Sequence, residues 1–217
     1  TWAKFLDDVQ ATVEATSSGP QSYYDRHADK APSGNDLRHH FTGSVVYDLP
    51  LGPGKLVDVR HRVATAIVRD WSLSGILDIR SGFYFGVTEL SNRLNAFSPR
   101  QRSSVVGDWA IPGDRSKAEW IQQYFNTAAF AFPGAGVAGN VARSFMSGPG
   151  SVSLDASLQR DIQIHERLRF QLRAEAYNAL NRANFGNPNG SRGSSAFGRI
   201  SSAASARILQ LGARLEF

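Results

Sequence analysis

The histidines near the start of the chain could in principle bind a metal ion or transfer a proton. His39 and His40 are adjacent and follow Asp36 and Arg38. Adjacent residues of a strand point to opposite faces, so these two imidazoles cannot share one ion there. We therefore interpret the pair as the basic beginning of a strand.

Carboxylates offer two further candidates for chemistry. His27 lies between Asp25 and Asp29 in a polar segment, which we interpret as a solvated loop, with a surface cation site as the alternative. A second group consists of charged residues that share one face of a predicted hairpin: Asp155, Asp161, Arg169, Arg173 and Glu175. Paired carboxylates can hydrolyse glycosidic bonds, but opposite charges on neighbouring strands more simply form cross-strand pairs.

Other catalytic and cofactor motifs are missing from the sequence. There is no cysteine, which excludes disulfides, thiolate metal sites and a cysteine nucleophile. No G-x-S-x-G motif is present, and no glycine-rich run follows a strand and opens a helix. The sequence therefore predicts a protein that is not an enzyme, with no catalytic or metal-binding residues and no cofactor.

Aromatic residues gather between residues 109 and 132, with arginines nearby: Trp109, Trp120, Tyr124, Phe125, Phe130, Phe132, Arg100, Arg102 and Arg115. Exposed aromatic rings beside arginines are typical contacts for sugars or peptides. We predict that Trp109, Trp120 and Tyr124 bind substrate. The alternative is that this loop packs a small core of its own.

The elements that would position these residues are long strands. From Ser151 to Gln163 apolar and polar residues alternate, interrupted only by Arg160, and the same period returns from Arg167 to Tyr177. A period of two predicts strands, and the polar tip His165-Glu166 makes them an antiparallel hairpin. Both strands exceed the usual length of about 5–6 residues and reach the roughly 9–11 residues that cross a bilayer. One face suited to lipid and one to water is typical of an outer-membrane barrel wall.

The same alternation predicts strands over 37–49, 71–85 and 208–217. Residues 1–9 alternate weakly and are either the end of a sixth strand or a short helix. The fold class is therefore all-β, with about six long antiparallel strands. Tyr47, Trp71 and Phe217 lie near strand ends, where barrels carry an aromatic girdle.

Long and shorter connections alternate along the chain. The long ones cover 10–36, 86–150 and 181–205, and the shorter ones 50–70 and 165–166. Barrels have short periplasmic turns and long extracellular loops. If Phe217 lies at the periplasmic rim, every long loop is extracellular.

Composition agrees with this interpretation. The mean hydropathy is -0.29, which suits a barrel because lipid-facing and water-facing residues alternate. No apolar run approaches the roughly 20 residues of a spanning helix. The net charge is +5, but no basic patch interleaved with aromatic residues is present, so we expect no nucleic-acid partner.

The sequence resembles the C-terminal barrel of TonB-dependent transporters of the Oar-like type, in which a carboxypeptidase-regulatory-like domain and a plug precede the barrel. The segments that carry the resemblance are TWAKFLDD, DLRHHFTGSVVYDLPLGPGK, WSLSGILDIRSGFYFGV, YFNTAAFAFP, GNVARSFMSGPGSVSLDASLQRDI, ERLRFQLRAEAYNALNRANFGNPNG, FGRISSA and the terminal Phe217.

This resemblance implies transport or reception of a substrate at the outer membrane of Gram-negative type. Residues 1–217 would be the C-terminal segment of a 22-stranded barrel, with the plug and N-terminal domain absent from it. The implied partners are outer-membrane lipid, TonB through the missing plug, and the barrel-assembly machinery through Phe217. The alternative from another class is a secreted soluble β-sandwich that binds carbohydrate through loop aromatics.

Overall fold

The computed structural model divides the chain into two units. It describes residues 1–8, 20–22, 24–95, 100–165 and 168–217. One unit, here called the loop unit, comprises residues 1–40, 80–151 and 185–204. The other, here called the strand unit, comprises residues 41–79, 152–184 and 205–217.

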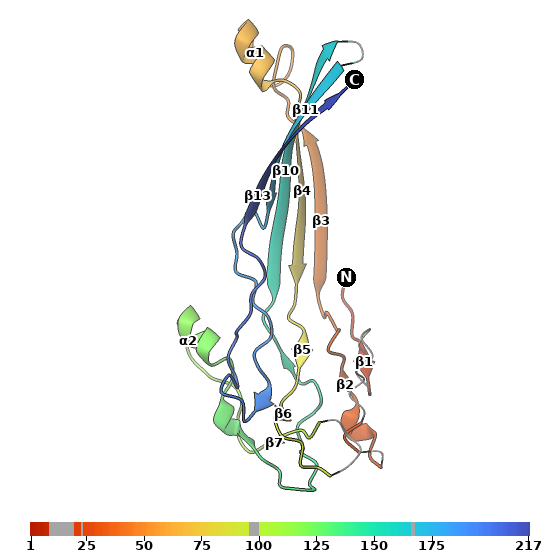
Figure 1. Ribbon diagram of the computed structural model, residues 1–217, viewed down its shortest axis with the longest axis vertical. Coiled ribbons are helices and arrows are strands. Elements are labelled where there is room, and N and C mark those ends of the chain that lie inside the picture. The colour runs from red at the N-terminus through yellow and green to blue at the C-terminus, as the bar shows by residue number, and fades with distance from the viewer. Residues whose placement is uncertain (9–19, 23, 96–99, 166–167) are drawn as a thin grey trace. The chain divides into compact units, whose positions relative to one another are not determined.

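Five long strands form a single open sheet (Figure 1). They are β3 (His40–Asp48), β4 (Trp71–Arg80), β10 (Ser151–His165), β11 (Leu168–Tyr177) and β13 (Ile208–Glu216). Their order is β13-β11-β10-β4-β3. β11 pairs antiparallel with β10 and with β13, and the arrows of β3 and β4 point in opposite directions in Figure 1. The predicted all-β antiparallel fold is confirmed.

The strand expected over 71–85 is divided in two. β4 ends at Arg80, and the two-residue strand β5 (Tyr84–Phe85) pairs instead with β9 (Met146–Ser147). Between them, Gly82 comes so close to the carbonyl oxygen of Gly148 that a Cβ atom would collide with it. The close approach of two backbones requires glycine at this point.

The first nine residues do not supply a sixth long strand within the described part of the chain. β1 (Leu6–Asp7) pairs with β2 (Ala31–Pro32). Before it, Thr1 and His40 exchange backbone hydrogen bonds, and the Ala3 N–H donates to the Arg38 carbonyl. The weak alternation of this segment therefore corresponds to short pairings rather than a full strand.

The register of the sheet separates apolar from polar side chains. Ala156 pairs with Ala176 and Phe170 with Leu215, which places the apolar residues of β10, β11 and β13 on one face. Ser157 lies opposite Glu175 on the other. Because side chains alternate along each strand, the whole sheet has one apolar and one polar face. We call these the apolar face and the polar face.

On the polar face two ion pairs join charges of the same strand. Arg173 lies 3.5 Å from Glu175, and Arg214 lies 3.1 Å from Glu216. These partners are two residues apart and so project from the same face of one strand. A cross-strand contact also forms, because the Gln171 amide donates to Asp161 over 2.9 Å.

The link between β3 and β4 contains the helix α1 (Arg62–Val68). Across the described residues no helix is long and apolar enough to span a membrane.

Arg160, which interrupts the apolar alternation of β10, is buried against this helix. Its guanidinium donates to the carbonyl oxygen of Ala66 and lies 5.8 Å from the centre of the Trp71 ring. A helix C-terminus carries partial negative charge, so the cation is stabilised there. The interruption of the pattern therefore marks a helix contact.

The loop unit contains short elements. Besides β1, β2, β5 and β9 they are β6 (Thr88–Glu89), β7 (Ser104–Val105), β8 (Phe130–Ala131), β12 (Ser191–Arg192), α2 (Lys117–Gln122) and two 3-10 turns, His27–Asp29 and Thr127–Ala129. Parts of three predicted connections, residues 10–19, 96–99 and Glu166, lie outside the described residues.

Candidate functional site

The long connections of the loop unit fold around an aromatic core. The buried side chains of this core are Val87, Phe125, Ala129, Phe130, Val141 and Met146. Phe125 and Phe130 pack edge to face, with centroids 5.4 Å apart and planes at 80°. Edge-to-face rings stabilise a core beyond the area that they bury. The alternative to substrate binding, that this loop packs a small core of its own, is therefore observed for these two phenylalanines.

The three residues predicted to bind substrate occupy two places around this core. Trp120 packs against Tyr124 with ring centroids 5.0 Å apart, and it also contacts Phe185. Trp109 packs edge on against Phe145 and is 39% exposed. The structure thus brings Trp120 and Tyr124 together, whereas Trp109 packs against a different ring, that of Phe145. A substrate-binding role for all three stays a prediction.

Tyr124 forms hydrogen bonds through both its side chain and its backbone. Its hydroxyl donates to the Ser147 carbonyl over 2.8 Å, and its backbone N–H donates to Gly198 over 2.8 Å. Burial raises the pKa of the Tyr124 phenol. The ring therefore connects neighbouring segments, and both it and the indole of Trp120 are half-buried.

Arg102 is buried in an ion pair and does not line a binding surface. Its guanidinium lies 3.1 Å from the carboxylate of Asp29, and it donates to the Ala28 carbonyl over 3.0 Å. Burial lowers the pKa of Arg102. Asp29 is 2% exposed and also accepts the backbone N–H of Gln21. Asp29, one of the two carboxylates considered for a cation site near His27, thus pairs with an arginine.

A second, half-buried arginine joins segments that are distant in sequence. Arg143 forms an ion pair with Asp7, and its Nε donates to the Asp29 carbonyl over 3.1 Å. Burial lowers the pKa of Arg143 as well. Such charge-assisted bonds are stronger than neutral ones, so the two arginines and their carboxylates fix the described parts of the first connection to residues 80–151.

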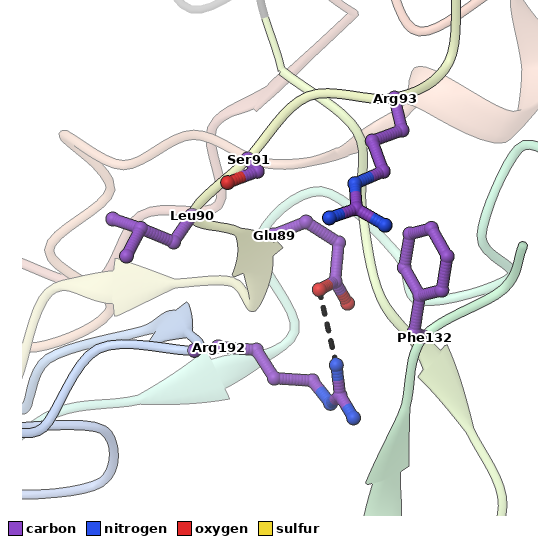
Figure 2. Close-up of a pocket in the computed structure, with 7 residues that line it drawn as sticks. Glu89, Leu90, Ser91, Arg93, Phe132 and Arg192 are labelled. Carbon is purple, nitrogen blue, oxygen red and sulfur yellow. Dashed lines mark hydrogen bonds and ion pairs between the residues drawn. The ribbon is translucent and has the colours of Figure 1, made fainter. Parts of the chain in front are cut away.

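A pocket of about 260 Å³ opens in the loop unit beside β6 and β12, which pair in parallel (Figure 2). Its lining consists of Glu89, Leu90, Ser91, Arg93, Phe132, Arg192 and Gly193. It contains two guanidinium groups and one carboxylate, so its net charge is positive. We call it the arginine pocket.

Hydrogen bonds hold the floor of the arginine pocket in place. Glu89 accepts from Arg192 over 3.1 Å, drawn as the dashed line in Figure 2, and from the Ser103 hydroxyl over 2.7 Å. The Nε of Arg192 donates to the Phe130 carbonyl over 3.1 Å. The carboxylate is thus neutralised by one of the two arginines.

Arg93 supplies the remaining positive charge of the pocket. Its guanidinium lies 5.6 Å from the centre of the Phe132 ring, and Figure 2 shows it above that ring. Within the described part of the chain it contacts no carboxylate. A cation beside an aromatic wall suits a ligand with an anionic group and an apolar body. Neither Arg93 nor Arg192 was predicted, because only the pairing of β6 with β12 brings them together.

The described residues contain no cluster of three or more histidine or carboxylate side chains that could hold a metal ion. The arginine pocket itself has a single carboxylate, Glu89.

Comparison with known proteins identifies the family. A family described as an outer membrane beta barrel domain matches residues 1–210. The chain belongs to this family. No curated protein and no solved structure matches it.

Membership of this family explains why the sheet has two unlike faces. An outer-membrane barrel presents apolar side chains to lipid and polar side chains to its interior. The apolar face of the sheet is therefore the lipid side, and the polar face is the lumen side. The chain is an outer-membrane protein domain, and an outer-membrane barrel lies in membrane lipid.

Proposed function

We propose that the chain is the C-terminal wall and loop portion of a TonB-dependent transporter or receptor, with no enzymatic activity. The observation that carries the proposal is the loop unit, whose connections fold on a core of their own and hold a positively charged pocket. A receptor needs a preformed binding surface, and the arginine pocket offers a concave site of this kind. The resemblance of the sequence to Oar-like barrels supports the same function.

In this proposal the five strands form part of a larger, 22-stranded wall in a Gram-negative outer membrane. The polar face keeps the lumen wet, and the folded connections capture substrate outside the cell. Trp109, Trp120 and Tyr124 provide aromatic contacts, and the arginine pocket provides an anion site. A plug outside residues 1–217 would bind TonB, and Phe217, which is 98% exposed, would bind the barrel-assembly machinery.

Cross-linking in cells tests TonB coupling. The complete protein that contains this chain is expressed in a Gram-negative host, treated with formaldehyde and probed for TonB. We expect a cross-linked species with TonB that disappears when the plug is deleted. The same sample is run on gels with and without heating, because a folded barrel changes mobility on heating. Heat-modifiable protein in the outer membrane without any TonB adduct would refute the transport proposal and leave the barrel assignment standing.

Truncation of the terminal aromatic residue tests the assembly partner. Deletion of Phe217 should lower the fraction of heat-modifiable protein in the outer membrane, whereas deletion of an exposed loop residue such as Tyr24 should not. Equal assembly of both variants would contradict the proposed role of Phe217.

A further inference from the structure

The segment between β3 and β4 presents apolar side chains that the strand unit does not cover. In α1, Val63 and Ile67 are one turn apart and are 62% and 59% exposed. Leu56, earlier in the same segment, is 89% exposed. Neighbouring exposed apolar residues of this size indicate a surface that contacts a partner or a membrane.

Side chains of the sheet bind the C-terminal end of α1. The indole N–H of Trp71 donates to the Ile67 carbonyl over 2.9 Å, and Arg160 donates to the Ala66 carbonyl. Both acceptors belong to the last turn, whose carbonyls have no partner within the helix. The helix is therefore held against β4 and β10 and is not an independent flexible turn.

These contacts place α1 on the lipid side of the wall. Arg160 shares the apolar face of β10 with Leu158 and Ile162, because residues two apart on a strand point the same way. Trp71 lies under the Arg160 guanidinium and so belongs to the same face. The exposed stripe of α1 is thus continuous with a surface that family membership assigns to lipid.

The charge of the segment fits a phospholipid surface. Residues 55–70 contain four cations, Lys55, Arg60, Arg62 and Arg69, and two carboxylates, Asp58 and Asp70, which leaves an excess of two positive charges (4 − 2). Arg60 pairs with Asp58 over 2.8 Å, and Arg69 with Asp70 over 3.3 Å. The excess therefore belongs to Lys55 and Arg62. Basic residues beside an apolar stripe are typical of helices that lie in a membrane interface.

We propose that residues 55–70 are an interfacial anchor for the barrel wall. The helix α1 lies in the headgroup layer of the phospholipid leaflet, with Leu56, Val63 and Ile67 in the acyl boundary and Lys55 and Arg62 on phosphate oxygens. Trp71 and Arg160 connect this anchor to the sheet. The end of β10 and the start of β11, which a short connection joins, lie at the same end of the sheet as α1 (Figure 1). Short connections are periplasmic in barrels, which makes the leaflet the periplasmic one. The inference rests on the family and does not require TonB.

Spin labelling tests the anchor directly, because the chain has no cysteine. Single-cysteine variants Ile67→Cys and Arg62→Cys are labelled with a nitroxide and reconstituted in vesicles of phosphatidylethanolamine and phosphatidylglycerol. Accessibility to oxygen and to a water-soluble nickel complex is measured. We expect a lipid-like ratio at position 67 and a water-like ratio at position 62. Water-like values at both positions would overturn the proposal.

Two controls separate this outcome from a failure of the barrel assignment. Leu211→Cys lies on the apolar face of β13, and Gln210→Cys on the polar face of the same strand. Lipid contact at position 211 but not at position 67 would refute the anchor and leave the barrel assignment standing. Lipid contact at position 67 but not at position 211 would support the anchor and contradict the assignment of the apolar face to lipid. A nickel-shielded label at 67 without lipid, or a disulfide-linked dimer of the unlabelled Ile67→Cys variant, would assign a second copy of the chain to this surface and overturn the proposal.

The charge component has its own test. Arg62→Glu is combined with the label at position 67 and compared in vesicles with and without phosphatidylglycerol. We expect a shallower label only in the vesicles that contain phosphatidylglycerol. An identical depth in both would refute the contact with anionic headgroups.

Discussion

A single charge placed on either face of β13 gives the sharpest test of how the wall lies in the membrane. Leu211 projects from the apolar face and is 85% exposed, whereas Gln210, the preceding residue, projects from the polar face. Both positions lie near the middle of a strand of nine residues. The variants Leu211→Arg and Gln210→Arg therefore introduce the same side chain at nearly the same depth on opposite faces.

The depth of Leu211 sets the expected magnitude. It is one residue from Gly212, the central residue of β13. A rise of about 3.4 Å per residue and a tilt of about 45° place it about 2.4 Å from the midplane. Arginine on the lipid face at the midplane costs about 2–4 kcal/mol. This lowers the folding equilibrium constant about 30-fold to several hundred-fold. For Gln210→Arg we expect a change near zero, because water solvates the lumen.

The assay is urea unfolding of the complete barrel from phospholipid vesicles, followed by tryptophan fluorescence and by heat modifiability on gels. The free energy of unfolding should fall for Leu211→Arg and remain close to the parent value for Gln210→Arg. A larger loss for Gln210→Arg would reverse the face assignment, and equal losses would show that neither face contacts lipid.

Three further predictions concern the loop unit. Asp29→Asn leaves Arg102 buried without its counter-ion and should destabilise the loop unit by about 3–5 kcal/mol, measured by urea-dependent proteolysis; a loss below about 1 kcal/mol would contradict a buried pair. Phe125→Ala empties the centre of the aromatic core and should cost about 3–5 kcal/mol in the same assay, with Phe125→Leu as the milder control. Hydrogen bonds from Ser116 lower the pKa of Glu119 below its ordinary value of 4.5, so its stabilisation of α2 is fully present above pH 4.5 and is lost as the pH falls through the lowered pKa. As the pH falls through the lowered pKa, amide hydrogen exchange at the start of α2 should become faster relative to the intrinsic exchange rates. The variant Glu119→Gln should show no such pH dependence.

The strands and their faces could be predicted from the sequence because the signal is local. Alternation within β10 and β11 assigns each side chain to a face before any partner strand is known, and the observed register only joins these faces. The ends of the strands were harder to predict. The strand expected over 71–85 ends at Arg80, because the backbones of Gly82 and Gly148 meet just after it. An alternation pattern along one strand cannot predict this contact, because Gly148 is distant in the sequence.

The candidate site was predicted only in part. Aromatic composition indicated that residues 109–132 were important, but burial divided them into a core around Phe125 and the more exposed rings of Trp109 and Trp120. Composition cannot make that division, because it depends on which segments pack together. The arginine pocket had no sequence signal, since Glu89 and Arg192 are separated by 103 positions.

The sequence by itself determined a two-faced wall of long strands joined by long and short connections, because alternation and loop length are properties of neighbouring residues. Only the tertiary structure decided what the exceptional residues do. Arg160 interrupts an apolar face in the sequence, and the folded chain shows it bound to the last turn of α1. In the sequence Asp29 lies in a polar segment and Arg102 near a group of aromatic residues, and folding buries them as a pair. The physical reason is the same in each case: the free energy of a buried charge depends on its partners, and distant segments supply those partners.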